Sequence, residues 1–348
     1  MEKLRVVDGE PTNSALLSIG MSIADSTSYE IQRLYDNGTL GKDLNRRGAS
    51  GDWLKAGDDV ADKVVRELWP ELEKQGIGCM YVYSEEEGVY KIGDPEKGGF
   101  FIVLDPLDGS NNIEEGMSSP PAVSVSLGMG RMSDISLDGL FEPISVGVVR
   151  DLCNYTGYYA IKGEGAFSYD AVRKNKRKME TSNTKDIRAS SKIGYDLDGG
   201  KSEVSQLKRI SVLETVVKET IETLQEDEKD KFKLCQRRLG SSILDFCKVA
   251  GKGYDSFLSI GGRMRYHDLA AAQLILKEAG GDFTSWIATA GKGDCHKGAD
   301  FIRHIFERSE DPEKVVKILK DTKYYAVGSA TEQLQDTLMA FVKKHKLI

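Results

Sequence analysis

The sequence is poor in the residues that build disulfide frameworks and zinc sites. It has five cysteines and four histidines in 348 residues. The cysteines are scattered, odd in number and form no Cys-x-x-Cys pair, so we expect no disulfide framework and a reducing compartment, the cytoplasm. The histidines lack the spacing of zinc ligands. We therefore expect His267 to be a surface or packing residue.

Long apolar runs and an excess of positive charge are also absent. No run of about 18 apolar residues occurs, so we expect no membrane span. Residues 1–14 lack the apolar centre of a secretory signal. The net charge of −7 argues against nucleic acid as a partner. A small anionic substrate remains compatible with this charge, because a bound metal can invert the local field.

Helical and strand-like patterns alternate along the whole chain. Helices are expected at 14–36, 58–76, 202–232 (one long or two shorter), 267–281 and 331–346, and residues 240–260 are expected to form a helix followed by a strand. Strands are expected at 78–88, 100–109, 122–130, 143–151 and 323–330, with a hairpin and Gly-rich turn at 155–169. The basic stretch 172–186 predicts a solvated loop or an edge strand. This mixture favours layered α/β packing.

Acidic residues gather at four places along the chain. These are Asp52 with Asp58, the run Glu85 to Glu87, Asp105 with Asp108, and Asp268 near the start of an Ala-rich helix. Each has an ordinary structural interpretation: acids cap helices, Asp-Pro and Asp-Gly form turns, and a glutamate run is often a solvated loop. For Asp268 alone, a simple capping role is the more common one.

The pair Asp105 and Asp108 is harder to explain in this way. Pro106 fixes the backbone between them, and Gly109 lets the chain approach another group closely. Such a turn can present two carboxylates and the Leu107 carbonyl to one point. Hard oxygen ligands of this kind suit Mg²⁺. The N–H groups that follow the turn could hold a phosphate if a helix or tight turn begins there.

With these motifs in this order, the sequence resembles the inositol monophosphatase and fructose-1,6-bisphosphatase superfamily. The motifs are GDWLKAGDDVAD, VYSEEEG, VLDPLDGSNNIE, GEGAF, RLGSS and RYHDLAAAQLILKEAGG. The resemblance implies Mg²⁺-dependent, lithium-sensitive phosphatase activity with two or three ions per site, Mn²⁺ being an alternative ion. It also implies an α/β (α+β) fold, the five-layer α-β-α-β-α sandwich, and a homodimer or homotetramer. The halves would be 1–152 and 153–348, joined near 150–155, with the metals between them.

The resemblance also assigns roles to individual residues. One metal would be bound by Glu85, Asp105 and the Leu107 carbonyl. A second metal would be surrounded by Asp105, Asp108 and Asp268. Glu86 and Asp58 would bind a third, weaker metal or orient the attacking water. Asp58 and the Ser110 hydroxyl would position the attacking water, and the N–H groups of Gly109 and Ser110 would hold the phosphate. Hydrolysis would be direct, by metal-activated water, without a covalent phosphoenzyme.

The substrate remains open between two branches of this superfamily. DPLDGSNNIE is closer to the fructose-1,6-bisphosphatases, whereas HDLAAAQLILKEAGG is closer to the inositol monophosphatases. This mixture resembles archaeal enzymes that accept both substrates. Arg263 and Arg265, and with a weaker case Arg238, could hold a second phosphate or be surface arginines. We expect a small sugar or polyol phosphate as substrate. The alternatives are a 3′(2′),5′-bisphosphate nucleotidase and a non-catalytic sugar-phosphate-binding relative.

Overall fold

The computed structural model describes residues 3–134 except 50 and 52, 141–187, 192–196, 235–287 and 322–344, with the isolated residues 218 and 222. Asp52 and nearly all of the expected helical segment 202–232 lie outside these ranges. In the described ranges, no helix combines the length and the apolar character needed to cross a membrane.

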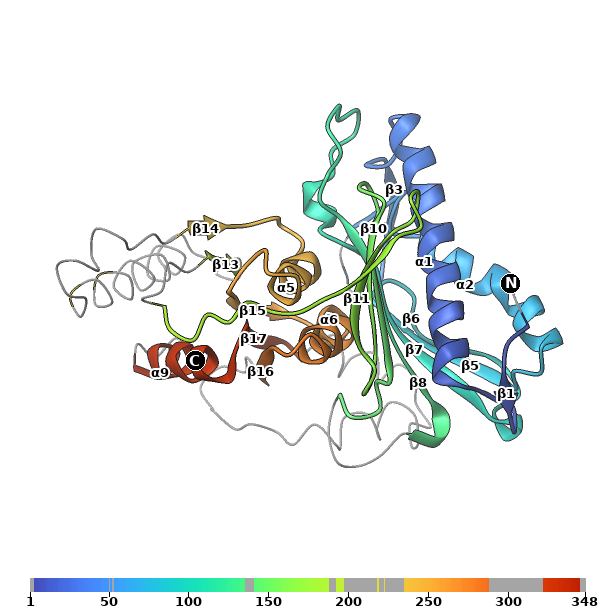
Figure 1. The fold of residues 1–348 in the computed structure, drawn as a ribbon. Coiled ribbons are helices and arrows are strands. Elements are labelled where there is room, and N and C mark those ends of the chain that lie inside the picture. Colours follow the sequence, from blue (N-terminus) through green and yellow to red (C-terminus); the bar gives the residue numbers. More distant parts are fainter. Residues whose placement is uncertain are drawn as a thin grey trace.

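Two β-sheets and three layers of helices make up the described chain (Figure 1). Helices α1 (Asn13–Asp36) and α2 (Val60–Lys74) cover the outer face of the larger sheet. Helices α5 (Ser242–Ala250) and α6 (Tyr266–Glu278) lie between the two sheets. Helix α9 (Glu332–Lys344) covers the far face of the smaller sheet. The predicted α-β-α-β-α sandwich is therefore confirmed.

The larger sheet has eight strands and is mostly antiparallel. In spatial order they are β12 (Lys176–Lys178), β11 (Gly165–Asp170), β10 (Thr156–Ile161), β9 (Val146–Asp151), β8 (Ser124–Arg131), β7 (Gly99–Asp108), β5 (Cys79–Ser84) and β6 (Gly88–Gly93). Only β5 and β7 pair in parallel among these neighbours. The exposed β12 forms one edge, as the basic composition of 172–186 predicted.

The smaller sheet has five strands. They run in the order β14 (Cys235–Arg237), β13 (Lys192–Asp196), β15 (Ser256–Met264), β17 (Tyr324–Ser329) and β16 (Asp282–Ile287). Two short ribbons complete the described strands: β1 (Val6–Val7) with β2 (Glu10–Pro11), and β3 (Asp43–Arg47) with β4 (Trp53–Lys55). The 3₁₀ turns are η1 (Pro95–Lys97), η2 (Ser110–Asn112) and η3 (Met132–Asp134).

The chain passes from one sheet to the other later than the predicted junction near 150–155. Strands β10, β11 and β12 all lie after that junction, yet they belong to the larger sheet. The antiparallel hairpin of β10 and β11 extends the sheet from β9, so the passage falls between Lys178 and Lys192. The division into halves at 152 thus does not follow the sheets, and it remains a prediction.

Apolar side chains form a core in each interlayer space. One cluster fills the space between α1, α2 and the larger sheet, with Ile19, Ile23 and Val65 facing Leu104 and Leu127. A second surrounds α5 and α6, and a third lies between the smaller sheet and α9. Because α6 lies between two sheets, its buried residues are found on all sides of the helix.

Candidate active site

The strand pair β5 and β7 brings the first two acidic motifs together. The two strands run parallel, with Ser84 opposite Leu104, and the Glu85 N–H donates to the Leu104 carbonyl at 3.1 Å. Parallel strands end at the same edge of a sheet. Glu85 and Asp105, twenty residues apart in sequence, therefore leave that edge side by side.

A bulge in β7 explains how Asp105 and Asp108 serve one site. Side chains three positions apart in a regular strand point to opposite faces. Here Asp105 pairs with Ser126 and Asp108 with Ser124, so β7 carries one extra residue between the two aspartates. A bulge of this kind redirects a side chain. The extra residue lies at the Pro106–Leu107 step, where proline in any case has no N–H to donate to the ladder.

Gly109 ends this segment with a backbone that requires glycine. Its φ is +86°, and a Cβ there would lie 2.7 Å from the Ala122 carbonyl oxygen. The following η2 turn is fixed by the Lys55 ammonium group, which donates to the Ser110 and Ile113 carbonyls at 2.7 and 2.8 Å. Lys55 thus ties the first acidic motif to the third.

The start of α6 adds Asp268 and His267. Asp268 occupies the third helical position and accepts the Arg265 N–H at 2.6 Å, the reciprocal half of a capping box. Its other oxygen lies 3.3 Å from His267 Nε2. The capping role and the place in the site are therefore compatible. His267 is buried, so it is not the surface residue that one interpretation expected, and its ring lies among the site carboxylates.

The N-terminus of α5 holds Asp108 in place. The Ser241 hydroxyl donates to the Asp108 carboxylate at 2.5 Å, and the Ile243 N–H donates to the same oxygen at 3.0 Å. Ser241 also caps α5 by accepting the Leu244 N–H. The RLGSS motif, at the start of α5, therefore orients Asp108, which lies at the end of β7.

Asp58 and the turn after β5 form the opposite wall. The Asp58 carboxylate accepts the Lys55 N–H at 2.6 Å. Ser84 donates to the buried Asp62 of α2 at 2.6 Å and accepts the N–H groups of Glu86 and Glu87. This network fixes the turn that carries Glu85 and Glu86. Glu87 instead faces outward, within 4 Å of Arg46 and Arg66, so the solvated-loop interpretation holds for that residue.

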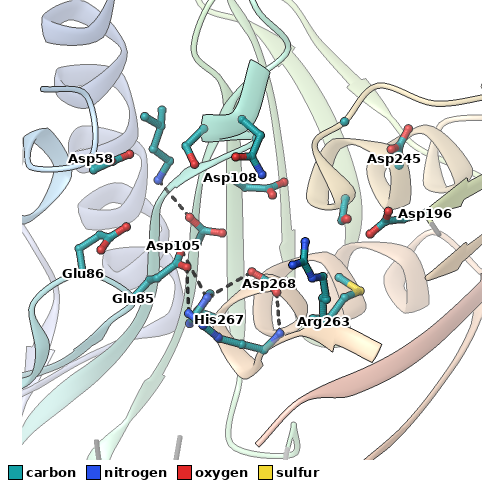
Figure 2. A pocket seen from close by; sticks show the side chains of 18 of the residues that line it. Asp58, Glu85, Glu86, Asp105, Asp108, Asp196, Asp245, Arg263, His267 and Asp268 are labelled. Carbon is teal, nitrogen blue, oxygen red and sulfur yellow. Dashed lines mark hydrogen bonds and ion pairs between the residues drawn. The ribbon is translucent and has the colours of Figure 1, made fainter. Parts of the chain in front are cut away.

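All the predicted site residues line one cavity of about 580 Å³. They are Asp58, Glu85, Glu86, Asp105, Leu107, Asp108, Gly109, Ser110, Arg263, Arg265 and Asp268. Figure 2 shows Asp58, Glu85 and Glu86 on one side, Asp105, Asp108 and Asp268 between, and Asp196 with Asp245 beyond. Arg265 donates to Glu85 at 3.2 Å and is mostly buried, whereas Arg263 is exposed at the rim. Arg263 is therefore better placed to meet a second phosphate.

The carboxylates repel one another in this cavity. Burial, followed by the charges of Glu85, Asp108 and Asp268, raises the pKa of Asp105 well above its usual range. Burial and then Asp268 raise the pKa of Asp108 to about 7, and burial raises the pKa of Asp58 to about 6. The pKa of Asp268 is also raised by burial. This unfavourable concentration of charge is what a divalent cation would neutralise.

Histidine and arginine offset only part of that charge. Burial alone would lower the pKa of His267, but Glu85 and Asp268 raise it. Burial alone would raise the pKa of Glu85, but His267 and Arg265 lower it. Arg265 and His267 therefore both lie against Glu85.

The unpaired atoms in the site fit a metal ion. Among the described residues, Asp58 Oδ1, Asp105 Oδ2 and His267 Nε2 are buried without a hydrogen-bond partner. Ligand atoms of Glu85, Asp105 and His267 lie within 4.8 Å of one another. Buried polar atoms in proteins are nearly always paired. The oxygen-rich donor set suits Mg²⁺ or Mn²⁺.

Comparison with known families agrees with this geometry. Residues 42–299 match the inositol monophosphatase family. The chain belongs to the inositol monophosphatase family. That match includes every motif from Asp58 to Asp268 that lines the cavity.

Relatives of this inositol monophosphatase family member carry several names. A bifunctional NADP phosphatase/NAD kinase of Methanococcus maripaludis is 29% identical over 77% of the chain, which spans only 43% of that relative. A fructose-1,6-bisphosphatase/inositol-1-monophosphatase of Archaeoglobus fulgidus is 30% identical, covering 68% of this chain and 72% of the relative. The structure of the MJ0109 inositol monophosphatase-fructose 1,6 bisphosphatase superimposes with a TM-score of 0.61 at 20% identity, covering 93% and 98%. This last likeness shows the fold.

Several residues of the site in this family member were not predicted from the sequence. Lys55, Ser241, His267, Asp196, Asp245 and Lys323 all contact or line it. Ser241 could have been found from the RLGSS motif, and Lys55 from its place beside Asp58. Asp196 and Lys323 carry no local signal, because they reach the cavity from the end of β13 and from just before β17, which lie far apart in the sequence.

Proposed function

We propose that this chain is a Mg²⁺-dependent phosphomonoesterase that hydrolyses a small sugar or polyol phosphate, fructose 1,6-bisphosphate or inositol monophosphate. The observation that carries the proposal is the convergence of Glu85, Asp105, Asp108 and Asp268 on one cavity, with Asp105 Oδ2 buried and unpaired. Membership of the inositol monophosphatase family supports it. The names of the archaeal relatives support both substrates.

Each side chain has a part in the proposed reaction. Glu85, Asp105, the Leu107 carbonyl, Asp108 and Asp268 would hold the metal ions, with Glu86 at a weaker third position. When bound, these ions would activate water and neutralise charge on the phosphoryl oxygens. Asp58 and the Ser110 hydroxyl would orient the attacking water, and the Gly109 and Ser110 N–H groups would hold the phosphate. No residue needs to form a covalent bond to phosphorus.

The rim of the cavity supports a second candidate, a nucleotide phosphatase. Trp53 lines the cavity, yet 57% of it is exposed, and the Arg47 guanidinium stacks 4.6 Å from its ring centre. An exposed indole at a site entrance can stack on a base. The NADP phosphatase name of the Methanococcus relative supports the same candidate.

A substrate panel with the full chain and Mg²⁺ tests these proposals. We expect phosphate release from fructose 1,6-bisphosphate, inositol 1-phosphate or both to exceed release from NADP and phosphoadenosine phosphate, and to be inhibited by Li⁺. A reversed preference would favour the nucleotide candidate. Release from none of them, with metal binding retained, would instead indicate a non-catalytic relative.

Substitution of Asp105 separates a catalytic metal site from an incidental cluster. Asp105→Asn keeps the shape of the side chain but removes a charged ligand, so we expect near-total loss of turnover with the circular dichroism spectrum unchanged. Asp336→Asn is the matched control, because Asp336 is exposed on α9. Unchanged turnover in Asp105→Asn would show that the metal site is misassigned.

A further inference from the structure

His267 lies inside the carboxylate cluster rather than beside it. Only 1% of the residue is exposed. Its Nε2 atom is 3.3 Å from Asp268 Oδ1 and 3.5 Å from Glu85 Oε2. Figure 2 shows the ring beneath Asp105, directed toward the acidic side chains. The ring therefore borders the volume in which the first metal would bind.

No described residue makes a hydrogen bond to Nε2. Carboxylate oxygens of Asp268 and Glu85 lie 3.3 and 3.5 Å from it, and these contacts do not have hydrogen-bond geometry. Two neighbouring ligands on one metal ion, each about 2.1 Å from it, lie about 3 Å apart. The separation of 3.5 Å between Nε2 and Glu85 Oε2 is near that spacing, and the ligand atoms of Glu85, Asp105 and His267 all lie within 4.8 Å of one another.

The other ring nitrogen has the partner that a metal-binding histidine needs. Nδ1 lies 3.3 Å from the Tyr83 hydroxyl, a contact buried on β5 two residues before Glu85. Metal-binding histidines usually donate this second N–H to a fixed acceptor, which orients the ring. Donation from Nδ1 to Tyr83 would leave the Nε2 lone pair facing Glu85 and Asp268. The opposite tautomer would make His267 only a weak donor to these carboxylates.

We propose that His267 Nε2 is a direct ligand of the first metal, together with Glu85 and Asp105. A nitrogen ligand among carboxylates favours Mn²⁺ or Co²⁺ over Mg²⁺, because imidazole binds harder oxygen-seeking ions poorly. The proposal rests on the metal site of the proposed function. It goes further by giving that site a mixed oxygen and nitrogen ligand set and a preference among ions.

Electron spin echo spectroscopy of bound Mn²⁺ tests the proposal without measuring turnover. Substoichiometric Mn²⁺ is added to the full chain, so that the tightest site fills first. We expect strong ¹⁴N modulation from a coordinated imidazole, replaced by the ¹⁵N pattern in uniformly labelled protein. We expect His267→Gln to lose this modulation. In calorimetric titrations we expect His267→Gln to weaken Mn²⁺ binding at least tenfold and Mg²⁺ binding less than threefold.

Three results would overturn the assignment. Bound Mn²⁺ without ¹⁴N modulation in the unmodified chain would show that His267 is no ligand, whether or not the variant folds. Equal weakening of Mn²⁺ and Mg²⁺ binding in His267→Gln would show that the residue only orients the carboxylates. Either result leaves the proposed phosphatase function intact. Failure of both ions to bind the unmodified chain would overturn the metal site and the proposed function together.

Discussion

Replacing Gly109 by alanine tests whether the turn after β7 is required by its backbone. Gly109 has φ +86°, and a Cβ would lie 2.7 Å from the Ala122 carbonyl oxygen and 3.2 Å from Ser241 Cβ. Gly116, seven residues later, is a matched control. It has φ +75° but nothing within 4 Å of a built Cβ.

The two variants share one penalty and differ in another. A left-handed backbone costs alanine about 1–2 kcal/mol, and both Gly109→Ala and Gly116→Ala incur it. Only Gly109→Ala must also move a carbonyl or the turn itself, and strain of this kind costs about 1–3 kcal/mol. We therefore expect the free energy of unfolding to fall by about 2–5 kcal/mol for Gly109→Ala and about 1–2 kcal/mol for Gly116→Ala.

Gly109→Ala should lower the rate of phosphate release by more than its loss of stability alone would cause. The displaced turn joins Asp108 to Ser110, and Asp108 is anchored by Ser241. Misplacement of reacting groups by about 1 Å can lower the rate about a hundredfold. We expect phosphate release by Gly109→Ala to fall by about ten- to a hundredfold, and release by Gly116→Ala to stay near the unmodified rate. Urea denaturation and steady-state phosphate release measure these effects. Equal losses of stability in both variants, or turnover of Gly109→Ala within threefold of normal, would refute this reasoning.

Two further predictions concern buried charge. The pKa values of Asp105, Asp108 and Asp268 are raised in the folded chain. These groups therefore bind more protons in the folded chain than in the unfolded chain between pH about 4 and about 7. Their contribution to stability falls as the pH rises through that window. We expect the melting temperature in EDTA to be lower at pH 7.5 than at pH 5, and Mg²⁺ to restore it; a rise with pH in EDTA would contradict this. The second prediction concerns Arg150, which is 2% exposed and has its Nε 3.5 Å from Asp25. We expect Asp25→Ala to lower the free energy of unfolding by about 2–3 kcal/mol. This loss is smaller than that for a fully buried ion pair, because Asp25 is half exposed. Arg150→Met, which replaces the charge with an apolar chain of similar length, should cost less in urea denaturation than Asp25→Ala, and the opposite order would refute this account.

Local patterns predicted the described helices and the longer strands of the larger sheet, but not β6, β13, β14, β16 or the two short ribbons. The helix expected at 14–36 is α1, Asn13–Asp36, and it ends at Asn37 and Gly38 as its sequence indicated. The hairpin expected at 155–169 is β10 and β11, and its glycine N–H groups bind the Glu278 carboxylate rather than a phosphate. Strand β6 was not predicted, because the Glu-rich turn before it was included in the strand expected at 78–88.

The bulge at Pro106–Leu107 could not be predicted, although the motif that contains it was. The sequence indicated a strand over 100–109 in which a sharp turn presents both aspartates. Strand β7 does continue to Asp108, but an extra residue within the strand, and not a turn, redirects one carboxylate. Both aspartates line one cavity, and proline and glycine restrict the chain around them locally. Whether that restriction makes a turn or a bulge depends on pairing with β8, which is not local.

The sequence by itself determined the proposed oxygen ligands and the rigid segment that carries two of them. Asp105, Pro106, Asp108 and Gly109 are adjacent, and their backbone preferences act over a few residues. Only the tertiary structure decided what surrounds these ligands. Parallel pairing of β5 and β7 placed Glu85 beside Asp105, and packing of α6 between the sheets buried His267 against both Glu85 and Asp268. Contacts between residues some 180 positions apart depend on how the layers pack, and no local pattern records that packing.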